Sequence, residues 1–224
     1  IEELQKLGID GLTADNMALV QAAIGNTATD GSGVDSIAKI QTLVTGIVNE
    51  YATAKGVIET YAKDGITAPQ TSDYVQYGVT KVDDSNVAAI NSAINAQVGS
   101  DTILSNDNDS DAVDTTPKVQ AIVDAYLTIL ATADETADNS DNPLASDYAA
   151  IGVTDVNDDA EELLLLGEVI DGLATTDVDA VSEVQAYADA VQSVMDAAAG
   201  DTSKPSIEEL QKLGIDGLTA DNMA

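Results

Sequence analysis

The chain has 224 residues and a formal net charge of −32, since 40 acidic side chains oppose eight basic ones, all of them lysines. This charge repels phosphate backbones and anionic lipid surfaces, which argues against nucleic acid as a partner and against membrane insertion. The sequence contains no Cys, His or Arg, which excludes disulfides, Ser-His and Cys-His nucleophiles and histidine metal sites, so we expect no enzyme.

The first eighteen residues, IEELQKLGIDGLTADNMA, recur without change at 207–224. The two copies begin 206 residues apart, which indicates recent duplication of a repeat of that length, and we expect the parent protein to carry many near-identical copies. Inside the repeat, three stretches align without gaps: PQTSDYVQYGVT (69–80), PLASDYAAIGVT (143–154) and PSIEELQKLGID (205–216). The repeat therefore consists of three diverged modules.

Each module is predicted to start with a short helix. Proline suits the first turn of a helix, and in each aligned stretch a glycine follows nine residues later. The glycine is followed by Ile or, in two of the modules, Val, the pattern of a Schellman ending with glycine in the left-handed conformation. The glycines in question are Gly8, Gly78, Gly152 and Gly214.

A second and a third helix are predicted to follow in each module. Thr13, Asp83 and Asn157 are placed as N-caps of the second helices. The third helices share a core, IAKIQTLV (37–44), TPKVQAIV (116–123) and VSEVQAYA (181–188), in which a glutamine recurs. The first of these is predicted to be the longest, from about residue 34 to residue 63, because apolar residues continue at helical spacing.

The predicted fold class is all-α, with three consecutive short three-helix-bundle modules arranged in series as an elongated rod. The predicted boundaries are 1–68 for the first module, whose first helix lacks its start, 69–142 for the second and 143–204 for the third. Residues 205–224 begin the next copy of the repeat. We expect the chain to be a monomer whose partners are neighbouring repeats.

The second module contains an Asp-rich insertion, SNDNDSDAVD (105–114). Asp107, Asp109, Asp111 and Asp114 imitate the alternating carboxylates that open a calcium loop. The glycine required at the sixth loop position is an alanine, and the glutamate at the twelfth is a lysine, so an EF-hand is excluded. Two interpretations stay open, a looser calcium site or a flexible acidic loop. No other cofactor is expected.

Paired carboxylates stand at predicted helix starts, where acidic side chains complement the helix dipole. The pairs are Asp83–Asp84, Asp158–Asp159 and Glu161–Glu162. An acid–base pair would need a pocket that separates the two pKa values, and we favour the simpler helix-start role. The stretch DGSG (30–33) lacks the Walker lysine and a preceding strand, so no phosphate loop is expected. We expect no catalytic residues.

The module IEELQKLGIDGLTADNMALVQAAI…VDSIAKIQTLVTGIV resembles the small three-helix albumin-binding modules of bacterial surface proteins, which also have a short helix with a Gly-Ile cap and a third helix with a Val/Ile-rich stripe. The acidic, cysteine-free tandem arrangement is similar to the repeat regions of giant bacterial surface adhesins. This resemblance implies an extracellular location on the bacterial cell surface and a role in cell adhesion.

Two functions are compatible with these observations. The first is a structural spacer that projects a distal binding domain of an adhesin away from the cell, since an array of short bundles gains length with every copy. The second is a repeated protein-binding module that captures a host or matrix protein and gains from multivalency. A calcium-stiffened linker is a third class, recognisable by a calcium-dependent melting temperature.

Overall fold

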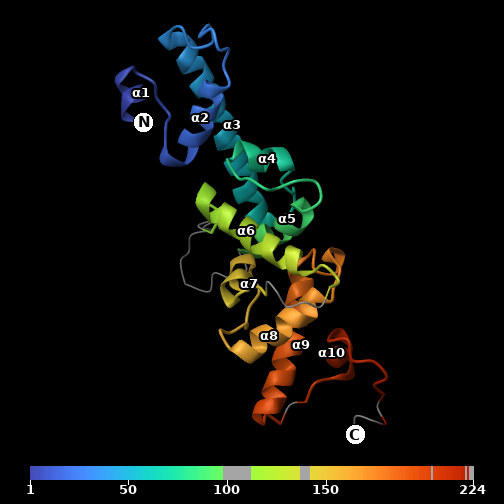
Figure 1. Cartoon of the computed structure of the whole chain (residues 1–224). Helices are drawn as coiled ribbons and strands as arrows, with labels where there is room; N and C mark the ends of the chain where they lie inside the picture. Colours follow the sequence, from blue (N-terminus) through green and yellow to red (C-terminus); the bar gives the residue numbers. More distant parts are fainter. Residues whose placement is uncertain (98–111, 137–141, 203, 220, 222–224) are drawn as a thin grey trace. The chain divides into compact units, whose positions relative to one another are not determined.

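The computed structural model describes residues 1–97, 112–136, 142–202, 204–219 and 221, and their regular structure is helical (Figure 1). In these ranges the only β-type pairing is an isolated bridge between Asp134 and Ala174. The all-α prediction is confirmed for this part of the chain. Two compact units can be distinguished, Ile1–Val87 with Ile103–Gln120, and Ala88–Thr102 with Ala121–Ala224. The predicted module boundaries follow the repeats in the sequence and stay a prediction.

Helices of increasing length recur three times along the sequence. The first compact unit contains α1 (Glu2–Lys6), α2 (Ala14–Gly25), α3 (Ile37–Asp64) and α4 (Thr71–Gln76). The division between the units falls within α5 (Val87–Ala96) and α6 (Thr116–Thr132). The second unit continues with α7 (Ala145–Ile151), α8 (Ala160–Asp171), the 3-10 turn η2 (Thr175–Asp177), α9 (Val181–Ala199) and α10 (Ile207–Lys212).

All four predicted Schellman endings form. At the end of α1, the Gly8 N–H donates to Gln5 O at 2.9 Å and the Ile9 N–H reaches Leu4 O at 3.2 Å. The same pair of bonds closes α4, α7 and α10, and the four glycines have φ between 76° and 95°. A fifth such ending, at Gly200 after α9, was not predicted. The local ending of each first helix thus follows directly from its glycine.

The predicted starts of the second helices are only partly correct. Thr13 caps α2, and its side chain accepts from the Asn16 N–H while the Asn16 side chain accepts from the Thr13 N–H. Asp83 aligns with Thr13 in sequence, but α5 begins only at Val87, four residues after Asp83, and the Asn86 side chain accepts from the Asp83 N–H at 2.9 Å. The prediction of Asn157 is wrong, because α8 begins two residues later with Asp159 as its N-cap. Asn157 instead donates to Glu162.

The long third helix of the first module is confirmed with a later start. It runs over 28 residues from Ile37 to Asp64, about 42 Å at the helical rise. Its start lies after residue 34 because the Ser36 side chain accepts from the Lys39 N–H and caps the helix there. Its end at Gly65 has the left-handed conformation.

The core of the first compact unit lies between α1, α2 and α3. It is built from Ile9, Leu12, Val20 and Val44, with Leu4, Met17, Ile24, Ile40, Ile47 and Val48 packed against it. Further along α3, Tyr51 packs on Tyr77 of the segment after α4, with ring centroids 5.1 Å apart. Because the chain has no Phe or Trp, buried tyrosines supply the large side chains of the core.

In the second compact unit, α8 packs against α9, and α9 packs against α10 (Figure 1). The buried side chains are Leu166 and Ile170 of α8 and Val184, Ala188 and Val191 of α9, with Ile129, Tyr126 and Tyr148 from the preceding helices. The Tyr126 hydroxyl donates to Val178 O at 3.1 Å, which ties α6 to the turn before α9. None of the described helices combines the length and apolar composition needed to cross a lipid bilayer.

Candidate functional site

The predicted calcium ligands fall mostly beyond the part that the structure describes. Asp107, Asp109 and Asp111 lie outside the described residues. Asp114 is described, and its carboxylate forms an ion pair with Lys118 at 2.9 Å, while its carbonyl oxygen accepts from Lys55 of α3. Among the described residues, no group of three acidic side chains is placed to hold a metal ion. Calcium binding therefore stays a prediction, and at Asp114 a calcium ion would compete with Lys118.

The first carboxylate pair, Asp83–Asp84, stabilises the turn that leads into α5. The Asp83 carboxylate accepts from the Ser85 hydroxyl at 2.5 Å and from the Ser85 N–H at 2.8 Å, and these bonds lower the pKa of Asp83. Asp84 accepts from the Thr71 hydroxyl at 3.4 Å. These residues line an open cleft of about 510 Å³. A lowered pKa keeps Asp83 ionised, which suits a helix start and not a general acid.

The other two carboxylate pairs lie at the start of α8. Asp159 accepts from the Glu162 N–H at 3.0 Å, and the buried Glu162 accepts from the backbone and side chain of Asn157. Glu161 and Asp158 are exposed. The described contacts of Asp159 and Glu162 are those of a helix start, which is the role that the sequence favours.

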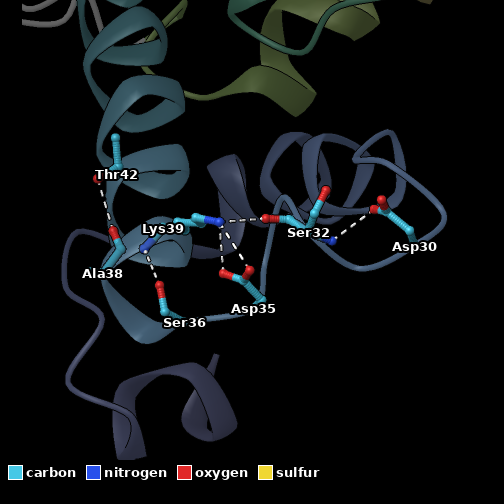
Figure 2. A network of polar contacts seen from close by, with 7 residues as sticks. All are labelled: Asp30, Ser32, Asp35, Ser36, Ala38, Lys39 and Thr42. Carbon is cyan, nitrogen blue, oxygen red and sulfur yellow. Dashed lines mark hydrogen bonds and ion pairs between the residues drawn. The ribbon is translucent and has the colours of Figure 1, made fainter.

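The DGSG stretch forms part of a loop held by one lysine. Figure 2 shows Lys39, in the first turn of α3, with its ammonium 2.8 Å from Ser32 O and 2.9 Å from the Asp35 carboxylate. The Ser32 N–H donates to Asp30 at 2.9 Å, which lowers the pKa of Asp30. The Lys39–Asp35 pair is about half exposed, so it contributes little to stability. The lysine closes the loop onto its own helix.

Two of the three glutamines that recur in the third helices, Gln120 and Gln185, hold the loop after the first helix, whereas Gln41 donates to the Thr45 hydroxyl on its own helix at 3.0 Å. Gln185 Oε1 accepts from the Thr154 N–H at 2.8 Å, and its Nε2 donates to Thr154 O at 3.2 Å. Gln120 makes the same two contacts with Thr80, at 2.8 and 3.4 Å. The sequence showed that the glutamine recurs but gave no partner for it, because the two residues lie 31 to 40 positions apart.

A second left-handed residue follows the glycine of every first helix by three positions. In α1 and α10 it is Gly11 and Gly217, with φ of 87° and 77°. After α4 and α7 it is Lys81 and Asp155, with φ of 67° and 62°. Non-glycine residues adopt this conformation at a cost, so other contacts must hold them there. One such contact is the Asn86 amide, which donates to Lys81 O at 2.9 Å.

The last repeated element, α10, packs on α9. Its Lys212 ammonium lies 5.5 Å from the centroid of the Tyr187 ring on α9, a cation–π contact. A cleft of about 370 Å³ separates α10 from α8 and is lined by Leu165, Val169 and Leu173 on one side and Leu213 on the other. Two contacts with Ser206, and a further one with Ser193 of α9, lower the pKa of Glu209.

Leu213 directly precedes the capping glycine, and the residues at the same position of the other first-helix stretches are Leu7, Tyr77 and Ile151. The environments of these four side chains differ. Tyr77 is fully buried, stacks on Tyr51 of α3 and donates to Val113 O at 3.1 Å. Ile151 is fully buried, and beside it Gln97 at the end of α5 donates to Ala150 O at 3.0 Å. Leu7 is 46% exposed. Tyr77 thus packs on α3, and the chain next to Ile151 contacts the end of α5.

The described carboxylates that the sequence singled out lie at helix starts or form ion pairs. The glutamine contacts with the loop recur at Gln120 and Gln185. Comparison of the chain with protein-family models, with curated protein sequences and with solved structures finds no match.

Proposed function

We propose that the chain is a structural spacer from the repeat region of a large extracellular bacterial adhesin, in which it projects a distal binding domain from the cell surface. The observation that carries the proposal is the burial of the first helix of a module against helices of the module before it. Tyr77 on α3 and Ile151 beside α5 are the two internal cases. Packing of this kind restricts the orientation of each module relative to the one before it.

The charge supports the same function. A net charge of −32 over 224 residues makes neighbouring chains repel each other and favours an extended arrangement of modules over collapse. The exact recurrence of an 18-residue segment supports a role that tolerates duplication of the whole repeat, because a longer spacer still works as a spacer. We further propose that the modules are three-helix bundles in series, which form an elongated rod.

Small-angle X-ray scattering tests the spacer function. The chain is compared with a two-repeat chain, in which a second 206-residue repeat is joined in the register of the natural one. If the repeat is a spacer, adding the second repeat should increase the maximum dimension of the chain by nearly the length of one repeat. Similar maximum dimensions for the two chains would contradict it.

Exposed apolar side chains favour one alternative, a repeated module that captures a host or matrix protein. Val75 of α4 is 61% exposed and Leu164 of α8 is 54% exposed. Isolated exposed apolar residues are ordinary, so the alternative needs binding data. Immobilised chain is tested against purified serum albumin and fibronectin, with Val75→Ser and Leu164→Ser as variants. Saturable binding that either variant weakens would favour capture over spacing.

A further inference from the structure

The helices α1 and α10 have the same sequence but different neighbours. The apolar side of α1, with Leu4, faces the core of its own module, and its Leu7 is 46% exposed. In α10 the counterpart of Leu7, Leu213, lines the cleft against α8, and Lys212 lies over Tyr187 of α9. The copy at α1 therefore shows the contacts of Leu4 with its own module, and the copy at α10 shows the contacts of Lys212 and Leu213 with α8 and α9.

The internal modules make both halves of these contacts at once. Tyr74 of α4 occupies the position of Leu4, Tyr77 just after α4 occupies that of Leu7, and both are fully buried. In α7, Tyr148 and Ile151 occupy the same two positions and are also fully buried. A first helix with a module on each side buries both positions. Leu7 is the one position of this set that the structure leaves largely exposed.

We infer that the Leu7 side of α1 is a docking surface for a preceding copy of the same repeat, and that it binds the face formed by α8 and α9 of that copy. The occupant is identified by the structure itself, because the segment already seated on this face has the sequence of α1. The inference rests on the tandem repetition that the proposed function assumes.

The chemistry of the two surfaces is complementary. The receiving face presents Leu165, Val169 and Leu173 to the leucine, and the Tyr187 ring to the ammonium group of the lysine. The docking surface consists of Glu3, Lys6 and Leu7, the counterparts of Glu209, Lys212 and Leu213. Each first helix is then shared by two consecutive repeats, and the junction is a packed contact in place of a free linker.

Thiol labelling tests this inference, because the chain has no cysteine and each substitution to cysteine gives a single reporter. In the two-repeat chain, one variant carries Leu7→Cys in the leading copy, and a second carries Leu→Cys at the same position of the central copy. We expect the central thiol to react with iodoacetamide at least about tenfold more slowly than the leading one, since labelling then requires local opening. Circular dichroism checks that both variants keep their helix content.

A further variant assigns the protection to the proposed face. Val169→Asp in the first repeat of the two-repeat chain should restore fast labelling of the central thiol, because it places a charge in the apolar half of the cleft. The same change in the second repeat leaves the central junction intact and is the matched control. A central thiol that reacts as fast as the leading one, or one that stays protected after Val169→Asp in the first repeat, would overturn the inference.

The labelling result and the scattering result can fail separately. If the central thiol is fully reactive but the two-repeat chain still gains a full repeat length, the docking is wrong and the spacer function stands. If the thiol is protected but the chain does not lengthen, the repeats dock without forming a spacer.

Discussion

The first eighteen residues and their copy at 207–224 have identical sequences, yet the structure places their apolar residues in different environments. Ile9 is fully buried between α1, α2 and α3, whereas its counterpart Ile215 is 45% exposed. The backbone is nearly the same in both, with Gly8 and Gly214 at φ of 76° and 78° and the same pair of Schellman hydrogen bonds. Neighbouring residues therefore determine the helix ending, and the helices packed nearby determine the burial.

The start of the two helices shows the same distinction at the local level. Before α10, Ser206 accepts from the Glu209 N–H, and Glu209 accepts from the Ser206 N–H at 2.6 Å, a complete capping box. Before α1 the N-cap position is Ile1, which has no side-chain oxygen to offer. The serine that caps α10 lies one residue before the shared segment, so this cap is not part of the sequence that the two copies have in common.

Raising the pH should unfold the chain, because its buried tyrosines lose their protons, and this is the largest effect that we expect. Burial raises the pKa of Tyr74, Tyr77, Tyr126 and Tyr148, and the shared 18-residue segment contains no tyrosine. The folded chain binds these protons more tightly, so their contribution to stability is complete below pH about 10 and is lost as the pH rises further. Absorbance at 295 nm should show these phenols ionising together with unfolding. Their ionisation near pH 10 in the folded chain would contradict this.

Truncating the same isoleucine in each copy tests the comparison directly. Ile9→Ala should lower the free energy of unfolding of the first compact unit by about 2–4 kcal/mol, because it leaves a cavity in the core. Ile215→Ala should cost less than about 0.5 kcal/mol, as is usual for exposed residues. Urea unfolding followed by circular dichroism measures both. Equal losses would mean that the two copies have the same environment.

Replacing two of the capping glycines by alanine separates the cost of backbone strain from the cost of a clash with a neighbouring helix. Gly8→Ala should cost about 1 kcal/mol, because alanine is strained at positive φ and its methyl group meets open space. Gly152→Ala should cost about 2 kcal/mol or more, since its Cβ would also lie 2.9 Å from the Ala96 methyl group. Urea unfolding gives the two values. A larger loss for Gly8→Ala would show that the contact with α5 is unimportant.

Removing a buried hydroxyl tests whether a tertiary partner matters. Tyr126→Phe should cost about 1 kcal/mol, because Val178 O loses its donor. Tyr148→Phe should be neutral or slightly stabilising, since the Tyr148 hydroxyl is buried with no hydrogen-bond partner among the described residues. Both lie in the second compact unit, so one set of melting curves compares them. A larger loss from Tyr148→Phe would indicate a partner for that hydroxyl.

Replacing the left-handed non-glycine residues by glycine should have the smallest effect, and it should increase stability. Lys81→Gly should raise the free energy of unfolding by about 0.5–1 kcal/mol, because glycine adopts φ of 67° without strain. Asp155→Gly should gain less, since aspartate tolerates this conformation better than lysine. Gly11→Ala, at the equivalent position of the first module, is the reverse control and should be destabilising. Thermal melting resolves the order of the three variants.

Much of the local structure could be predicted from the sequence. The four glycine endings and the Thr13 cap depend on residues a few positions apart, and all were found where the pattern placed them. Asn157 was misplaced as a cap because Asp159 offers an equally good oxygen two residues later, with the Glu162 N–H in reach. Short-range competition between two good caps is not resolved by the pattern alone.

The partners of repeated residues could not be predicted. The glutamine of the third helix recurs visibly, but its contact with Thr80 or Thr154 requires the loop and the helix to be brought together by packing. The left-handed conformation of Lys81 does not follow from lysine itself, which does not favour it, and the Asn86 amide that donates to Lys81 O was not part of the pattern. The predicted calcium ligands Asp107, Asp109 and Asp111 lie outside the described residues. Of the four predicted ligands, the structure therefore describes a partner for Asp114 alone, the ion pair with Lys118.

The sequence by itself determined how the short first helices end, because a glycine ending is satisfied by backbone groups within a few residues. Only the tertiary structure decided which side of each helix is buried, because burial depends on elements that lie far away in the chain. Leu7 and Leu213 have the same neighbours in sequence; the nearby α8 places Leu213 at the edge of a cleft, while Leu7 stays largely exposed.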